Sequence, residues 1–101
     1  MGKKTSFKDI INSSKPVLVD FSAAWCGPCQ AMSPVLKQVA GKIGSDARII
    51  KIDVDKNPKL ASQYKVRGVP TFILFKKGKK IWRDSGMQSA AQLEKLLKGA
   101  M

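Results

Sequence analysis

The 101-residue sequence has no histidine, only two cysteines and no long apolar run. Without histidine the chain cannot use Ser-His-Asp or Cys-His catalysis, and it cannot bind a metal ion through imidazole. A membrane-spanning helix needs roughly 18 apolar residues in a row, and the first six residues offer no apolar stretch for a signal peptide. We therefore expect a soluble, unexported protein with no membrane partner.

Acidic residues are also scarce, with seven Asp and Glu against 19 Lys and Arg and a formal net charge of +12. Such a charge suggests nucleic acid, anionic membranes or acidic proteins as partners. The lysines are spread along the chain, however, and one Tyr and two Trp offer few side chains for stacking on bases. We expect the positive charge to attract acidic protein partners to this chain, and we expect no binding of nucleic acid. The alternative function is a basic binding module.

The residues that are present suit one globular unit. Hydrophobic residues make up 44% of the chain, enough for a core, and there is no repeat, low-complexity segment or flexible linker. We predict a single domain over residues 1–101.

Helical and strand patterns alternate along the chain. Ser6 and Ser89 are expected to cap the first and last helices. The segment Lys76-Lys77-Gly78-Lys79-Lys80 is expected to form a hairpin with a glycine turn. The expected helices lie at about 7–12, 27–43, 58–64 and 90–97, and the expected strands at 17–21, 47–54, 71–75 and around 81–82. This order predicts an α/β sandwich with a mixed sheet of four to five strands and helices on both faces, with Trp82 packed on a sheet face.

The two cysteines lie in Trp25-Cys26-Gly27-Pro28-Cys29, directly after the apolar strand at 17–21 and at the start of a helix. Unpaired amides and the positive end of the helix dipole should stabilise a Cys26 thiolate, the nucleophile of disulfide exchange. Cys29 lies one turn further on, close enough to form a disulfide, and should be the less exposed thiol. A zinc site needs about four ligands, and the chain has no third cysteine and no histidine, so we expect a redox pair and no metal.

These residues and several others resemble the thioredoxin family in order and spacing, from about Phe7 to Leu97. The residues that carry the resemblance are Asp20, Trp25-Cys26-Gly27-Pro28-Cys29, Pro34, Lys51, Gly68-Val69-Pro70-Thr71, Gly78 and Gly86. The resemblance implies a thioredoxin fold and a cytoplasmic protein-disulfide reductase, monomeric and without a bound cofactor. It also implies recharging by a thioredoxin reductase and electron transfer to disulfide-containing client proteins, which we expect to be acidic.

The resemblance also assigns roles to residues of the site. Cys26 would attack the client disulfide, Cys29 would resolve the mixed disulfide, and Gly27 and Pro28 would complete the active-site loop. Asp20 would transfer protons, because burial in an apolar strand raises a carboxyl pKa, and Lys51 would be its partner, the alternative being an ordinary exposed lysine. A cis Pro70 would form a shallow client-binding groove together with Trp25, Gly68, Val69, Gly86 and Met87.

The chain departs from the family pattern at Ser22, where relatives often carry an aromatic residue, and this puts the redox tuning in question. The residues before Ser6 are too few for the family's usual first strand. A disulfide-forming oxidant or isomerase is an alternative on the same fold, but such relatives tend to carry histidine between the cysteines. Met1-Gly2, followed by Ser6, also fits a myristoylation pattern, so a lipid anchor is a further alternative.

Overall fold

A computed structural model describes residues 6–101, so the expectations about a first strand and a lipid anchor at residues 1–5 lie outside it. The elements alternate along the chain much as the sequence predicts. They are α1 (Phe7–Ile11), β1 (Val17–Ser22), α2 (Gly27–Ile43), a 3-10 turn (Gly44–Asp46), β2 (Arg48–Asp53), α3 (Pro58–Gln63), β3 (Thr71–Lys76), β4 (Lys79–Ser85) and α4 (Ala90–Ala100).

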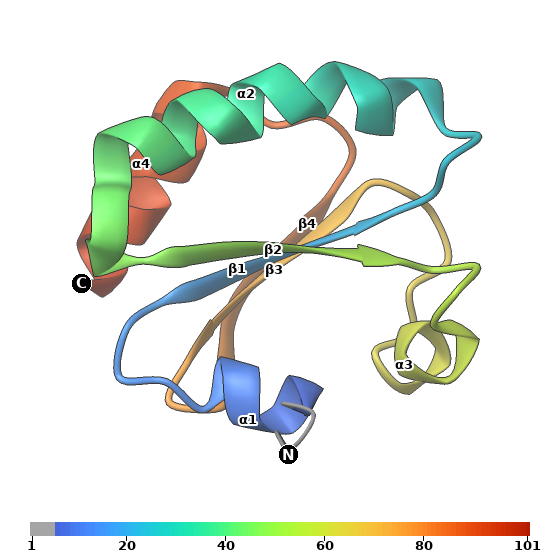
Figure 1. The fold of residues 1–101 in the computed structure, drawn as a ribbon, viewed down its shortest axis with the longest axis horizontal. Coiled ribbons are helices and arrows are strands. Elements are labelled where there is room, and N and C mark those ends of the chain that lie inside the picture. The colour runs from blue at the N-terminus through green and yellow to red at the C-terminus, as the bar shows by residue number, and fades with distance from the viewer. Residues whose placement is uncertain (1–5) are drawn as a thin grey trace, which may run out of the picture.

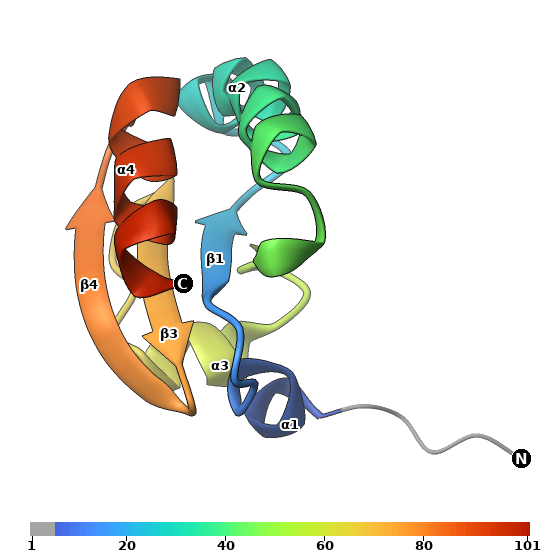
Figure 2. The same ribbon diagram turned by 90° about the vertical axis from the view of Figure 1, so that its left-hand side faces the viewer.

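The described strands form one mixed sheet in the order β2-β1-β3-β4. β1 runs parallel to β2 and antiparallel to β3, and β3 and β4 form an antiparallel hairpin. Helices α2 and α4 lie side by side on one face, and α1 and α3 lie on the other (Figure 1, Figure 2). The predicted sandwich is therefore confirmed, with four strands among residues 6–101.

β1 is buried along its whole length because the sheet is covered on both faces. Alternate side chains point to opposite faces of a strand. Leu18 packs under α2 and α4 together with Met32, whereas Val19 and Phe21 pack on the side of α1 and α3. Asp20 follows the alternation of Leu18, so its carboxyl group faces the layer of α2 and α4.

Local sequence signals set most of the element ends. The Ser6 hydroxyl accepts a hydrogen bond from the Asp9 amide, and the Ser89 hydroxyl accepts one from the Gln92 amide, both at 3.1 Å. Both predicted caps are confirmed. Asn57 precedes α3, but its side chain does not cap that helix and donates to the Asp53 carbonyl oxygen instead.

The hairpin turn and its flanking strand also agree with the sequence. Lys77 and Gly78 have φ values of 53° and 80°, the left-handed conformation that a two-residue turn between twisted strands requires. Trp82 packs against the core beneath α2 and α4, as predicted. Among residues 6–101, no helix combines the length and apolar character needed to span a bilayer.

Candidate redox site

Cys26 and Cys29 lie at the N-terminus of α2, where they form a disulfide with a Cα–Cα distance of 5.3 Å. Cys26 is the N-cap residue, and its sulfur accepts the Cys29 amide N–H at 3.2 Å. Cys29 is fully buried and Cys26 is 4% exposed. The inner sulfur is thus the less exposed one, as expected, but Cys26 is itself buried in the disulfide form rather than openly exposed.

This position suits reversible disulfide chemistry. The first amides of a helix have no carbonyl partner within the helix, and the aligned peptide dipoles place partial positive charge there. A negative charge on the Cys26 sulfur is stabilised by both, and the thiolate is the reactive form in disulfide exchange. Gly27 and Pro28 are the first two residues of α2, and both are exposed.

Asp20 is the buried acid near the middle of the sheet, only 1% exposed. Among residues 6–101, neither carboxyl oxygen finds a hydrogen-bond partner. Burial raises its pKa from 3.8 to about 6, and the Lys51 charge opposes part of that rise. The group can therefore gain and lose a proton close to neutral pH, which an ordinary aspartate does not do.

Lys51 stands beside Asp20 in the parallel pairing of β1 with β2. The Lys51 side chain is exposed, and no ion pair joins Lys51 to Asp20. Its effect on the acid is a longer-range attraction that favours the charged carboxylate. Lys51 is therefore an exposed strand lysine that also acts electrostatically on Asp20.

The Val69-Pro70 peptide bond lies beside the disulfide and is cis, as the family resemblance implied. The Cys26 sulfur lies 3.6 Å from the Val69 carbonyl oxygen. Pro70 is buried and Val69 partly buried, while Gly68 is exposed. The loop that ends in Pro70 therefore forms one wall beside the sulfur.

One hydrogen bond closes this loop on itself, and a second holds it against the end of β4. The Thr71 hydroxyl donates to the Gly68 carbonyl oxygen at 2.6 Å, and the Gly86 amide donates to the Pro70 carbonyl oxygen at 2.9 Å. Gly86 has a φ of 87°, which favours glycine. Met87 follows it and is 56% exposed. The structure thus joins the loop around Pro70 to Gly86.

Trp25 precedes the disulfide and is 72% exposed. Its indole N–H donates to an Asp55 carboxyl oxygen at 2.8 Å, and the Asp55 amide donates to Asp53 at 2.8 Å. Asp55 was not among the residues predicted for this site. Asp55 directly follows the strand expected at 47–54, but nothing in the sequence there indicated a contact with Trp25.

Ser22 ends β1 and is 1% exposed. Its small side chain borders a cavity of about 270 Å³, which is also lined by Gln30, Lys51 and Asp53. The position that departs from the family pattern therefore lies beside an open cavity near the start of α2. Among the described residues, no three His, Cys, Asp or Glu side chains are grouped as metal ligands would be.

Comparison with known proteins identifies relatives of this site and fold. The thioredoxin family model matches residues 1–99. A thioredoxin-like protein of Synechocystis is 50% identical over 84 residues, which are 83% of this chain and 80% of that protein. Chloroplastic thioredoxin Y1 of Arabidopsis thaliana is 48% identical over 89 residues, which are 87% of this chain but only 52% of that protein. A mutant thioredoxin from Halobacterium salinarum has a similar structure, with a TM-score of 0.85, 42% identity and coverage of 97% of this chain and 85% of that one.

Proposed function

This chain belongs to the thioredoxin family of thiol-disulfide oxidoreductases, and we propose that it works as a protein-disulfide reductase. The main support for this proposal is the Cys26–Cys29 disulfide at the N-terminus of α2, beside the wall formed by Val69 and Pro70. The proposal extends to a single domain over residues 1–101 that is monomeric and cytoplasmic.

The reaction follows from the order of the two sulfurs. In the reduced protein the Cys26 thiolate attacks a client disulfide, forms a mixed disulfide and releases one client thiolate. The Cys29 thiolate then attacks the Cys26 sulfur, re-forms the Cys26–Cys29 disulfide and releases the second client thiolate. Two electrons pass to the client, and two protons complete its thiols. A thioredoxin reductase would return the two electrons.

Asp20 would accept the proton that Cys29 must lose before it can resolve the mixed disulfide. A raised pKa of about 6 makes the Asp20 carboxylate a better base near neutral pH than an ordinary aspartate. Lys51 would act as its partner by favouring the charged form. Asp20→Asn should slow resolution at neutral pH while Cys26 attack continues. Stopped-flow resolution rates equal to those of the parent from about pH 6 to 9 would remove Asp20 as the proton acceptor.

Clients would bind as extended segments along Trp25, Gly68, Val69, Pro70, Gly86 and Met87. Small or apolar side chains beside the sulfur allow a client backbone to approach closely. Recognition of the client backbone needs little side-chain specificity, so a broad client range is expected.

The charge around this groove favours acidic clients. A cavity of about 530 Å³ next to it is lined by Lys65 and Arg67 together with Val54 and Val66. Lys65 and Arg67 are exposed. Reduction of an acidic client should therefore slow as salt rises from low to physiological concentration, because salt screens exposed charges. Equal rates at both salt concentrations would remove the electrostatic contribution.

The reduction potential tests the direction of the reaction. The Cys26–Cys29 pair is equilibrated in thiol buffers and followed by Trp25 fluorescence, with Cys29→Ser as a control that cannot form the disulfide. A value near that of thioredoxin itself, about −270 mV, supports a reductase and shows that Ser22 is tolerated. A value above about −200 mV would make the protein an oxidant or isomerase and would reverse the proposed electron flow.

A further inference from the structure

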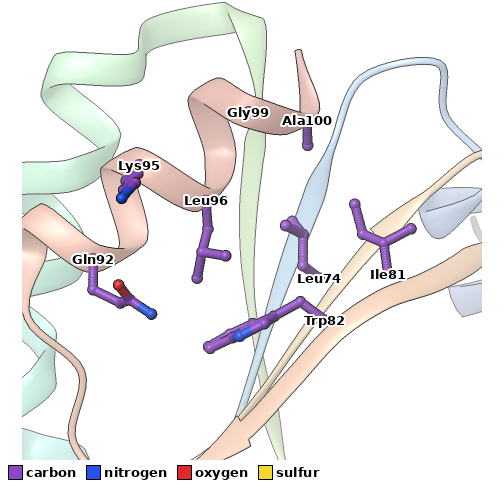
Figure 3. A pocket seen from close by; sticks show the side chains of 8 residues that line it. All are labelled: Leu74, Ile81, Trp82, Gln92, Lys95, Leu96, Gly99 and Ala100. Atoms are coloured by element: carbon purple, nitrogen blue, oxygen red, sulfur yellow. The ribbon is translucent and has the colours of Figure 1, made fainter.

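A second surface feature lies away from the disulfide, between helix α4 and strand β4 (Figure 3). It is an open groove of about 490 Å³. Leu74 and Trp82 form its floor, Leu96 of α4 forms one wall, and Ile81 of β4 stands opposite (Figure 3). A groove of this size, lined mostly by apolar side chains, is suited to binding another molecule.

A β-bulge adds Ile81 to this groove. Leu74 pairs with Trp82, but the next pair joins Phe75 to Lys80, so Ile81 has no partner on β3. In a regular strand Ile81 and Trp82 would point to opposite faces. The bulge re-aims the side chain, as bulges do at functional edges, and both residues line the same groove. Ile81 is left 51% exposed.

The border of the groove is positively charged. Lys95 lines it, and Lys98 lies one turn further along α4. The nearby acid Glu94 points to α2, where its carboxylate lies 3.8 Å from the Lys42 ammonium group. Within the part of the chain that the structure describes, neither of these two lysines forms an ion pair. An occupant with carboxylates along its edges would therefore complement the groove.

The position of β4 favours a helical occupant. β4 is an outer strand of the sheet, and a partner strand could in principle extend the sheet there. A bulge and edge lysines oppose such pairing. A second copy of this chain is disfavoured as the occupant, because two molecules that each carry a net charge of +12 repel one another. A helix with one apolar face needs no backbone pairing and can lie along a groove of this kind.

We propose that the groove between α4 and β4 binds an acidic amphipathic helix of a partner protein. Apolar side chains of that helix would cover Ile81 and Trp82, and its carboxylates would face Lys95. The C-terminus, at the end of this groove, lies at the opposite end of the molecule from the turn between β1 and α2 (Figure 1). Such a partner would leave the disulfide accessible, so the site could hold this protein beside a client or an electron donor during turnover.

The probe is a synthetic peptide of about 15 residues with Leu at helical spacing on one face and Glu on the other. A scrambled peptide of the same composition is the control. Titration into the isotopically labelled full chain, followed by amide NMR shifts, should perturb β4 around Ile81 and α4 around Lys95. Ile81→Ser should weaken binding by about tenfold or more, whereas Ile81→Leu should retain it.

Charge variants separate groove binding from general attraction. Lys95→Glu should weaken peptide binding several-fold more than Lys59→Glu, which makes the same change at an exposed position on α3. This pair also decides the question if Ile81→Ser does not fold. Reduction of a model disulfide protein should be unchanged in the Ile81 and Lys95 variants, so the test is independent of the redox proposal.

Several results would overturn the proposal. The first is that the scrambled peptide binds as tightly as the helical peptide. The second is that millimolar peptide causes no amide NMR shifts. The third is that Lys95→Glu and Lys59→Glu weaken peptide binding equally. Sedimentation that shows a dimer of the parent, lost in Ile81→Ser, would assign the groove to a second copy instead.

Discussion

Replacing the buried Asp20 by Asn should stabilise the folded protein at neutral pH but not in acid. The folded state raises the pKa of Asp20 from 3.8 to about 6, chiefly through burial. Between these values the folded protein binds a proton that the unfolded chain has lost, so stability falls as the pH rises through this range. Each pKa unit corresponds to about 1.4 kcal/mol, so the charged carboxylate costs about 3 kcal/mol of folding free energy at pH 7.

Asn has a similar shape and no proton to lose, so this cost should disappear in Asp20→Asn. Neither the protonated Asp20 carboxyl nor the amide that replaces it in Asp20→Asn carries a charge, so the free-energy difference between burying one and burying the other does not depend on pH. The stability gain of Asp20→Asn should therefore grow by about 3 kcal/mol between pH 3.5 and pH 7. The other titrating groups are shared by both proteins and cancel in the difference.

Urea denaturation at several pH values, followed by far-ultraviolet circular dichroism, measures this difference. Asp46→Asn, a matched change at an exposed acid, should show no comparable growth between pH 3.5 and pH 7. In Lys51→Met the loss of an attractive positive charge should move the fall in stability to higher pH. A gain in Asp20→Asn that is equal at both ends of the pH range would refute the assignment of a desolvated carboxyl group.

Three further changes test contacts elsewhere in the structure. Gly78→Ala should lower the free energy of unfolding by about 1 kcal/mol in urea, because the φ of 80° disfavours any side chain; an unchanged midpoint would contradict this. Arg83→Met should cost about 1–2 kcal/mol by the same assay, since its guanidinium group donates to two backbone carbonyls after α3. Asp55→Ala should speed hydrogen exchange at the Trp25 indole N–H, which loses its acceptor. The Trp82 indole serves as the internal control in that NMR measurement, and an unaltered Trp25 rate would show that the bond is not maintained in solution.

Much of the architecture was predictable because its signals are local. The capping hydroxyls of Ser6 and Ser89 lie within three residues of the amides that they accept. The turn at Gly78 depends on the conformation of its own backbone. The paired cysteines are separated by one helical turn, so their proximity follows from helix geometry.

The order of elements, the layers and the position of the disulfide could therefore be predicted from the amino-acid sequence. Three features emerged only from the folded chain. The Trp25 indole donates to Asp55, the Asp20 carboxyl has no hydrogen-bond partner among the described residues, and Ile81 turns into the groove beside Trp82. These features join segments far apart in the chain or depend on the register between strands. A shift of one residue in that register would reverse which side chains face each other, and no short-range pattern encodes it.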